Sequence, residues 1–410
     1  GVTAMTKTNI ATTMPQVKGF LSSFGQSILS LSFNFGGMLA GTLAVYFSVF
    51  SLAPWSIALF PGILSVRGAI GGLFSGRLST DLHLGTVKAS YTKNTKNFYL
   101  LLRSVIVLAL VSGVMVGLGA SLFGIFLWKA NVIDFIEILA VVIATMGLSV
   151  LFVPPITLAV SVFSFRRGLD PDVILYPVIS TVADIIVTAC YIFSLNVFFN
   201  VTAFGNYLIW LIDFIFFFIV LYILVKNIRE ENFVETIKEF LLTLVVVTFI
   251  VNVTGSLLVK VSEAIDNRPE IYAVYPALID TMGDVGSIIG STATTKLALG
   301  LIRPSFSSIR QHISEIGGAW LASIVMFVLY SIFSSFISGA KTLGDLMMFA
   351  TQLLTTNILA VSVMILIAYA VAIFTFRRGW NPDNFVIPIE SSLADTVTTA
   401  AILVALAIIV

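Results

Sequence analysis

Long apolar runs alternate with short polar segments along nearly the whole chain. Eleven of these runs reach the length of about 20 residues that an α-helix needs to cross the hydrocarbon core of a bilayer. They lie near 26–50, 55–74, 98–127, 135–163, 173–199, 207–225, 237–261, 271–293, 313–337, 346–375 and 385–410. The pattern predicts an all-α polytopic membrane protein. The two longest polar connections, 79–97 and 226–238, are expected to form interfacial or connecting helices.

The composition supports a membrane protein and excludes several other classes. The chain has 410 residues, of which 58% are hydrophobic and 10% charged, whereas soluble domains carry about 25% charged residues. The single cysteine, Cys190, cannot build a disulfide framework or a thiolate metal site within one chain. A net charge of +1 gives no reason to expect nucleic acid as a partner, whereas the apolar runs make membrane lipid an expected partner. Residues 1–19 lack the features of a signal peptide and are expected to form a polar tail.

Lysine and arginine are distributed unevenly over the connecting segments. If the N-terminus lies inside, seventeen of them fall in inside segments or adjoining span ends, and four fall in outside segments. Because cytoplasmic segments carry the excess of cations, we predict a cell-membrane protein with a cytoplasmic N-terminus and the end of this sequence outside. That end, Val410, falls inside an apolar run, so a further C-terminal segment is expected.

A motif that ends in an acid within an apolar run occurs twice. The first copy begins Phe-Arg-Arg-Gly-Leu-Asp-Pro-Asp at Phe165 and continues to Asp184. The second begins Phe-Arg-Arg-Gly-Trp-Asn-Pro-Asp at Phe376 and continues to Asp395, at an offset of 395 − 184 = 211 residues. A second pair of segments, starting at Pro61 and Pro276, aligns without gaps at an offset of 276 − 61 = 215 residues.

These two pairs, in one order and at nearly one offset, predict a duplicated unit of five spans. Five spans end on the side opposite their start, so two parallel copies require one more crossing, which the run at 207–225 supplies. We therefore predict an N-terminal tail, a first repeat, a linker transmembrane helix and a second repeat, at 1–19, 20–203, 204–232 and 233–410. The repeats are expected to be related by a pseudo-two-fold axis along the membrane normal, as a single-chain pseudo-dimer.

Charged side chains within spans cost about 2.5–3.5 kcal/mol at the bilayer centre, so they usually serve a function or have a partner. On the fifth spans, hydroxyl residues precede Asp184 and Asp395 on the same helical face. On the second span, half two has acids and half one has small residues. The candidate cation-binding residues are Ser65, Gly68, Ser180, Thr181, Asp184, Asp280, Gly283, Asp284, Glu390, Ser391, Ser392 and Asp395.

Oxygen ligands of this kind suit a hard cation. We predict Mg²⁺ as the transported ion, with Mn²⁺ or another divalent cation as alternatives. Because Asp280, Asp284 and Glu390 have no acidic counterparts in half one, a second site for Na⁺ or H⁺ confined to half two is a further hypothesis. The structural alternative is that an intramembrane aspartate only bonds a neighbouring serine or pairs with Arg67, which could neutralise Asp280 or Asp284.

At these residues the sequence resembles the MgtE and solute carrier family 41 group of magnesium transporters. The segment around Arg67 that ends in Arg-Leu-Ser-Thr at 77–80 resembles the family's second-span signature, and the turn-to-aspartate motif resembles its fifth-span signature. The resemblance implies that Asp184 and Asp395 correspond to the pore aspartate and that Gly68 and Gly283 line the same path. It also implies fusion of the two subunits that form a dimer in the MgtE branch. Where the family commonly has Asn after the glycine, this chain has Ala69 and Asp284.

The leading hypothesis is a divalent cation transporter with a central site between the repeats, and no enzymatic activity. A coupled carrier is favoured over a Mg²⁺ channel because the acids are asymmetric. An intramembrane aspartyl protease also needs two membrane aspartates, but the Gly-x-Gly-Asp and Tyr-Asp contexts of those enzymes are missing.

Overall fold

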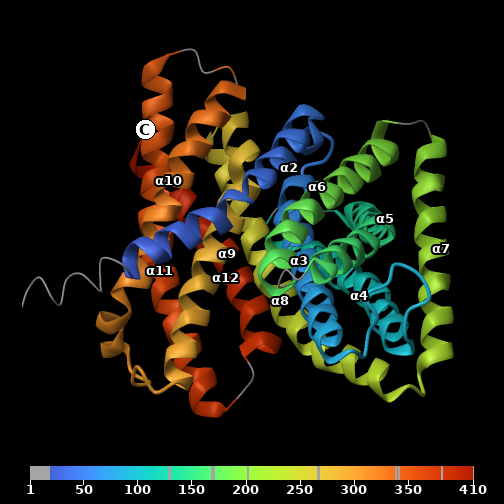
Figure 1. The fold of residues 1–410 in the computed structure, drawn as a ribbon. Helices are drawn as coiled ribbons and strands as arrows, with labels where there is room; N and C mark the ends of the chain where they lie inside the picture. The colour runs from blue at the N-terminus through green and yellow to red at the C-terminus, as the bar shows by residue number, and fades with distance from the viewer. Residues whose placement is uncertain are drawn as a thin grey trace, which may run out of the picture. The chain divides into compact units, whose positions relative to one another are not determined.

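The computed structural model describes residues 19–127, 131–167, 171–200, 203–265, 268–337, 339, 342–379 and 382–409, and regular structure within these ranges is helical throughout (Figure 1). The tail expected at 1–19 lies outside these residues except for Gly19. A helical segment at 19–32 is followed by the elements α2 (Phe35–Tyr46), η1 (Val49–Ser51), α3 (Ser56–Leu84), α4 (Lys96–Leu127), α5 (Val132–Arg166), α6 (Pro171–Asn200), α7 (Ala203–Asn227), α8 (Glu231–Ile265), α9 (Pro269–Ala298), η2 (Phe306–His312), α10 (Ile313–Ile337), α11 (Leu343–Arg378) and α12 (Pro382–Ile408).

The prediction of an all-α polytopic membrane protein is confirmed. Within the described ranges, ten helices are long and apolar enough to cross a membrane, and they match ten of the eleven expected runs. α9 occupies the place of the remaining run but is not among the ten, because Asp280, Asp284 and many small polar residues make it less apolar. The extra helix α7 has the lowest buried share of the ten, 22%, and Figure 1 shows it on the outside of its neighbours.

The prediction of a helix over 79–97 is wrong. α3 continues to Leu84 and ends at Gly85, whose φ of 72° lies in the left-handed region that glycine adopts without a Cβ penalty. The chain then runs without helix to α4. Asn94 holds this loop together, because its side-chain amide donates to the Lys88 carbonyl at 2.9 Å and its side-chain oxygen accepts from the Lys88 N–H at 3.0 Å.

The described chain forms two compact units that do not follow the repeat boundaries. We call Gly36–Ala277 the central unit, and Gly1–Phe35 together with Leu278–Val410 the terminal unit. The central unit therefore holds α8, the first span of the predicted second repeat, and the terminal unit holds most of the first span of the predicted first repeat. The two repeats are predicted from the sequence motifs, whereas the two units are defined by which residues lie in contact in the structure.

Two matched contacts in the central unit explain this exchange of first helices. α8 packs against α3 and α4. A Cβ on Gly255 of α8 would overlap the carbonyl of Ala58 on α3, and a Cβ on Gly41 of α2 would overlap the carbonyl of Ala273 on α9. The offsets are 255 − 41 = 214 and 273 − 58 = 215 residues, close to the 211 and 215 of the two motif pairs. In both contacts the first helix of one repeat packs against the second helix of the other, and glycine allows the backbones to approach.

The two Arg-Arg turns make the same contact in their respective units. At the end of α5, Arg166 donates from Nε and Nη2 to the Ala89 carbonyl at 2.9 and 2.7 Å. At the end of α11, Arg377 donates from Nη2 to the Pro304 carbonyl at 2.8 Å. The offsets, 377 − 166 = 211 and 304 − 89 = 215, repeat those of the two motif pairs. The duplication therefore extends from sequence to individual hydrogen bonds.

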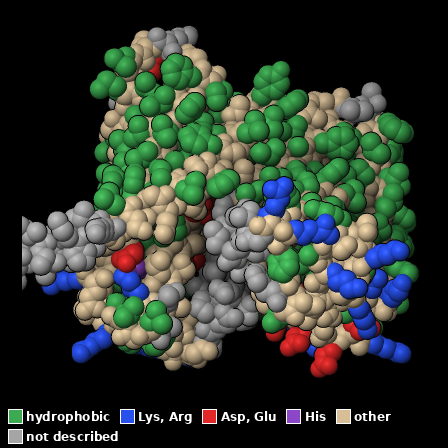
Figure 2. Space-filling model, viewed as in Figure 1, with side chains coloured by type: hydrophobic (Ala, Val, Ile, Leu, Met, Phe, Trp, Pro, Cys, Tyr) green, Lys and Arg blue, Asp and Glu red, His purple; other side chains and the backbone are tan. Residues whose placement is uncertain are grey.

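Basic side chains gather near these turns. In the central unit, Arg77 pairs with Glu239 at 2.8 Å and Lys96 pairs with Glu230 at 2.7 Å, so the end of α3, the start of α4 and the start of α8 lie together. Figure 2 shows hydrophobic side chains over much of each unit and Lys and Arg side chains toward one end of it. This distribution agrees with the pattern on which the predicted orientation depends.

Candidate cation-binding site

The two matched aspartates lie on α6 and α12. Both helices begin at a proline, Pro171 and Pro382, a residue whose fixed φ and missing N–H suit the first helical position. Asp184 and Asp395 are each 5% exposed. Ser392 is buried beside Asp395, whereas Ser180, Thr181 and Ser391 are half-buried. Each fifth span therefore presents hydroxyls and one carboxylate in surroundings largely shielded from solvent.

Asp284 is held by a residue from the other end of the chain. In the terminal unit, Asn34 donates from Nδ2 to Asp284 Oδ2 at 2.8 Å and also reaches Thr281 Oγ1 at 3.4 Å. Thr281 in turn bonds the hydroxyl of Tyr330 on α10 at 2.9 Å, and Tyr330 is close enough to both Asp280 and Asp284 to experience their charge. The half-buried acids of α9 thus belong to a network that spans three segments of this unit.

Glu390 occupies a space made by two glycines. Its side chain is 2% exposed, and Oε1 has no hydrogen-bond partner among the described residues. A Cβ on Gly286 would lie 3.1 Å from Oε1, and a Cβ on Gly290 would lie 3.2 Å from Oε2. On the same helix, a Cβ on Gly283 would lie 3.5 Å from Ser391 Oγ. The glycine face of α9 therefore gives α12 room for a buried carboxylate.

In the central unit, the intramembrane cation lies near an aspartate. Arg67 on α3 is 6% exposed and experiences the negative charge of Asp184 on α6, a helix against which α3 packs. Ser65 and Gly68 on the same helix are half-buried, and a Cβ on Gly68 would meet nothing within 4 Å. Open space therefore adjoins α3 at the glycine expected to line an ion path.

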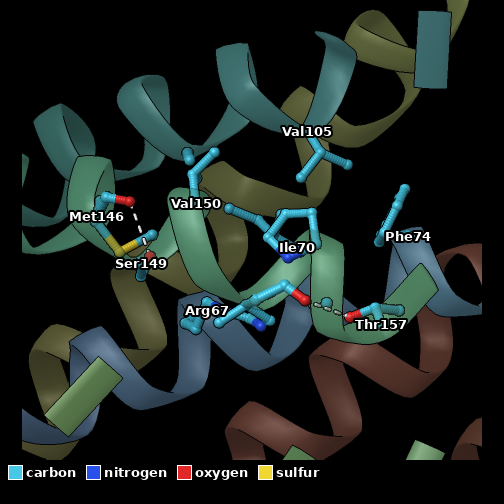
Figure 3. Close-up of a pocket in the computed structure, with 12 residues that line it drawn as sticks. Arg67, Ile70, Phe74, Val105, Met146, Ser149, Val150 and Thr157 are labelled. Atoms are coloured by element: carbon cyan, nitrogen blue, oxygen red, sulfur yellow. Dashed lines mark hydrogen bonds between the residues drawn. The ribbon is translucent and has the colours of Figure 1, made fainter. Parts of the chain in front are cut away.

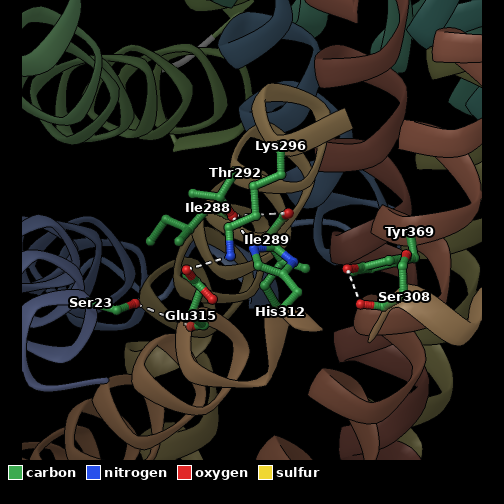
Figure 4. Close-up of polar contacts among 9 residues, drawn as sticks. All are labelled: Ser23, Ile288, Ile289, Thr292, Lys296, Ser308, His312, Glu315 and Tyr369. Carbon is green, nitrogen blue, oxygen red and sulfur yellow. Dashed lines mark hydrogen bonds and ion pairs between the residues drawn. The ribbon is translucent and has the colours of Figure 1, made fainter. Parts of the chain in front are cut away.

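A further polar cluster connects α9, η2 and α10 in the terminal unit (Figure 4). Lys296 Nζ contacts Glu315 Oε1 at 2.6 Å, and Thr292 Oγ1 contacts Nε2 of the fully buried His312 at 2.8 Å. Ser23, from the N-terminal helical segment, donates to the Glu315 carbonyl at 3.2 Å. This cluster contains none of the predicted site residues, and its contacts fasten the turn between α9 and α10 to the first helix.

Reasoning from sequence missed Asn34, Thr281 and Tyr330. Asn34 carries the only signal that could have found any of them, because it is an amide inside an expected apolar span. Thr281 and Tyr330 resemble ordinary residues of membrane helices. Within the described part of the chain, no three or more His, Cys, Asp or Glu side chains gather closely enough to hold a metal ion directly.

Buried carboxylates on matched helices, within a set of membrane-spanning helices whose sequence is duplicated, are typical of a polytopic transport protein. Comparison with known families gives a narrower result. The chain matches the family model MgtE, described as a divalent cation transporter, over residues 60–194 and 275–405, which is more than half of its length. It belongs to the MgtE family of divalent cation transporters, and the predicted resemblance and tandem arrangement are confirmed. No curated protein and no solved structure matches the chain.

The two matched segments run from α3 to α6 and from α9 to α12, so each includes one of the paired aspartates. α7 lies outside both segments, as expected for a linker helix between repeats. α8, the helix predicted to begin the second repeat, also lies outside them.

Proposed function

We propose that this protein transports Mg²⁺ and that Asp184 and Asp395 are the carboxylates that hold the ion. The observation that carries the proposal is that the two aspartates occupy matched places in the two family segments and are each 5% exposed. Mg²⁺ gives up its water reluctantly and is usually bound through one or two carboxylates. The duplication supports one central site shared by both aspartates. Mn²⁺ and other divalent cations are alternative cargoes.

The other predicted residues act on the hydration shell of the ion. Hydroxyl and carbonyl oxygens accept hydrogen bonds from metal-bound water, and Ser65, Ser180, Thr181, Ser391 and Ser392 supply hydroxyls on the same helices. Gly68 and Gly283 have no side chain to block the path. The half-buried state of Ser65, Gly68, Ser180 and Ser391 supports this role, because a fully packed face would not admit a hydrated ion.

The transporter is a carrier coupled to Na⁺ or H⁺. Asp280, Asp284 and Glu390 support this, because the first repeat has Ser65, Ala69 and Ile179 at the equivalent positions, by the offsets of 215 and 211 residues. Acids confined to one repeat provide a place for a coupling ion that the shared site does not need. A Mg²⁺ channel is the alternative mechanism. The chain works as a single-chain pseudo-dimer with its N-terminus in the cytoplasm.

Uptake of Mg²⁺ into proteoliposomes tests the ligands. Asp184→Asn and Asp395→Asn keep side-chain size and remove the charge, so each is expected to abolish most Mg²⁺-dependent uptake. Asp213→Asn is the matched control, because Asp213 lies on α7, outside both family segments. Uptake by the two variants at the level of Asp213→Asn would refute the proposal.

A second measurement separates the carrier from the channel. For a carrier, uptake should depend on an imposed Na⁺ or pH gradient, and Glu390→Gln should weaken that dependence more than it weakens equilibrium Mg²⁺ exchange. A channel would conduct Mg²⁺ equally well without either gradient, and Glu390→Gln would then leave the gradient experiment unchanged.

A further inference from the structure

Exposed lysines and arginines gather where two spans end in the Arg-Arg turns. α5 ends at Arg166 and α11 ends at Arg378, and both helices are long and apolar enough to cross a membrane. A spanning helix ends where the hydrocarbon of the bilayer gives way to lipid headgroups, so these arginines lie at the level of the lipid phosphates. Arg67 is different, because it is buried and lines a cavity between α3, α4 and α5 (Figure 3). Only the exposed cations of the turns can meet a ligand that stays at the bilayer surface.

In the central unit, the first arginine of the turn binds a tight bend in the loop between α3 and α4. The N–H of Ser90 donates to the Lys88 carbonyl at 2.7 Å, which closes a three-residue turn around Ala89. Arg166 binds the Ala89 carbonyl, and its guanidinium also lies over the ring of Tyr91, 5.3 Å from the centroid. The bend therefore places the exposed Lys88 one residue from the contact that Arg166 makes.

The terminal unit repeats this bend between α9 and η2. The N–H of Ser305 donates to the Arg303 carbonyl at 2.7 Å, which closes the turn around Pro304. Arg377 binds the carbonyl of this central residue from Nη2. Arg303 is exposed and is the equivalent of Lys88, since 303 − 88 = 215 residues. The positive charge is thus present in both copies although the side chain differs.

The second arginine of each turn lies over an aromatic ring in the last part of its span. The distance from Cζ to the ring centroid is 5.0 Å for Arg167 and Phe163. It is 5.3 Å for the matched pair, Arg378 and Phe374. The two rings are 51% and 49% exposed. Contact with a ring face attracts a guanidinium but uses none of its five N–H donors, which therefore suit a phosphate group.

Each turn thus gathers three exposed cations. They are Lys88, Arg166 and Arg167 in the central unit and Arg303, Arg377 and Arg378 in the terminal unit. The bonds of Arg166 and Arg377 go to uncharged carbonyl groups, and the ion pairs between described residues include neither arginine. The motif copies that continue from these turns carry fewer acids than three, namely Asp170 and Asp172 in the first and Asp383 in the second.

We propose that each Arg-Arg turn binds the headgroup of an anionic phospholipid, so that the chain has two lipid sites, one in each unit. The lipid phosphate accepts hydrogen bonds from the guanidinium groups and from Lys88 or Arg303, and the acyl chains lie along the exposed ring of Phe163 or Phe374. A lipid fits better than a free phosphate, because the cations lie at the ends of spanning helices beside exposed aromatic rings. The proposal does not depend on which ion the protein transports.

The bound lipid has a structural consequence for the proposed ion site. The first turn leads directly into α6 and the second into α12, the helices that carry Asp184 and Asp395. A headgroup that holds the turn therefore also holds the start of the helix that follows it.

Native mass spectrometry of the purified protein counts the lipids that stay bound. The protein in detergent is titrated with dioleoyl phosphatidylglycerol, and in parallel with dioleoyl phosphatidylcholine, which has the same acyl chains and no net charge. We expect two molecules of phosphatidylglycerol to bind at a lower concentration than any phosphatidylcholine. Phosphatidylglycerol should also raise Tm, because a ligand that binds the folded state stabilises it.

Replacement of the cations by glutamine removes the charge and keeps a polar side chain. Lys88→Gln, Arg167→Gln should remove one of the two tightly bound lipids, and Arg303→Gln, Arg378→Gln should remove the other. Each cation near an anionic lipid contributes about fivefold to binding, so each double variant should weaken its own site about 25-fold. All four side chains are exposed, so both variants are expected to fold. If one does not, the other decides.

The control removes two exposed cations that belong to neither turn. Arg229→Gln, Lys238→Gln changes the net charge by the same amount near the junction of α7 and α8 and should leave both lipids bound. If this control loses as much phosphatidylglycerol as the turn variants, the lipid is attracted to the whole basic end and the proposal is refuted. Two tightly bound lipids in both turn variants would refute it as well.

Inorganic phosphate distinguishes a lipid headgroup from a free anion. At the concentration that saturates the sites with phosphatidylglycerol, phosphate should neither displace the lipid nor raise Tm. If phosphate displaces the lipid from the wild-type protein and stabilises it but not the turn variants, then the turns bind a soluble anion and the assignment to lipid is wrong.

Discussion

The close approach of α8 to α3 makes Gly255→Ala a sharp test of the exchanged helices. The added methyl group would meet the Ala58 carbonyl, and because this is backbone, it moves only if a whole helix moves. Overpacking of this kind costs about 1–3 kcal/mol, and contact with backbone places this site at the upper end. Replacement of glycine by alanine within a helix returns about 1 kcal/mol. The net loss of stability is therefore about 2 kcal/mol.

The expected change is measurable as a shift in Tm. The central unit has 277 − 36 + 1 = 242 residues, and in domains of 150–250 residues each kcal/mol shifts Tm by about 2–4 °C. Thermal melting of the detergent-solubilised protein, followed by the loss of the monodisperse peak in size-exclusion chromatography, should show Tm lowered by about 4–8 °C. Gly41→Ala should behave similarly, because its Cβ would meet the Ala273 carbonyl in the matched contact.

Gly76→Ala is the control on the partner helix α3. A Cβ there meets nothing within 4 Å, so only the gain in helix propensity remains and Tm should stay the same or rise. If Gly255→Ala and Gly76→Ala have the same Tm, then α8 does not pack closely on α3 and the exchange described for the central unit is wrong.

Three further changes test other contacts of the terminal unit. Lys296→Met leaves a mostly buried Glu315 without its ion pair and should lower the free energy of unfolding by about 1–2 kcal/mol. The loss is smaller than for a fully buried pair because both side chains keep some exposure. In the double variant Lys296→Met, Glu315→Gln the unpaired charge is gone and Tm should recover, so a double variant that melts as low as Lys296→Met would contradict this. Gly300→Ala places a side chain at a φ of 68° and should cost about 1–2 kcal/mol, whereas an unchanged Tm would mean that the loop adopts another conformation. Asn34→Ala removes a donor to the Asp284 carboxylate, a bond worth about 1.5–3 kcal/mol. It should lower Tm more than Ser32→Ala, whose hydroxyl bonds only the Leu29 carbonyl on the same segment, and equal melting would remove Asn34 from the network.

Much of the architecture could be predicted from sequence because duplication and hydropathy are linear features. The offsets of 211 and 215 residues found from the motifs reappear in the hydrogen bonds of Arg166 and Arg377. The glycine contacts of Gly41 and Gly255 have nearly the same offsets, 214 and 215. The partners of each helix could not be predicted in the same way. An apolar face shows that a helix is buried in lipid or protein, but it does not say which neighbour covers it.

The polar residues show the same limit at the site. Sequence placed Arg67 inside a span but left its partner open between several acids, since the choice depends on which helix lies beside α3. In the structure α3 packs against α6, the helix that carries Asp184, so Asp184 is the acid whose charge reaches Arg67. Gly286 and Gly290 admit the carboxylate of Glu390, and the spacing of small residues along one helix does not indicate which side chain of another helix fills the space. Asn34 was missed because its amide, although unusual in an apolar span, does not indicate its partner, Asp284, which lies 250 residues further along the chain.

The exchange of first helices determines when the parts of the terminal unit can assemble during translation. The terminal unit begins with residues up to Phe35 and resumes only at Leu278, so its opening helix leaves the ribosome with no permanent neighbour. At about 5–20 residues per second, the intervening chain takes roughly 10–50 seconds to translate. During that interval the first helix must stay in the bilayer or against the insertion machinery without associating elsewhere. A pause or a truncation before α9 would therefore leave the first helix without the helices it packs against. Quality-control proteases would be expected to recognise the incomplete chain by this unpacked helix.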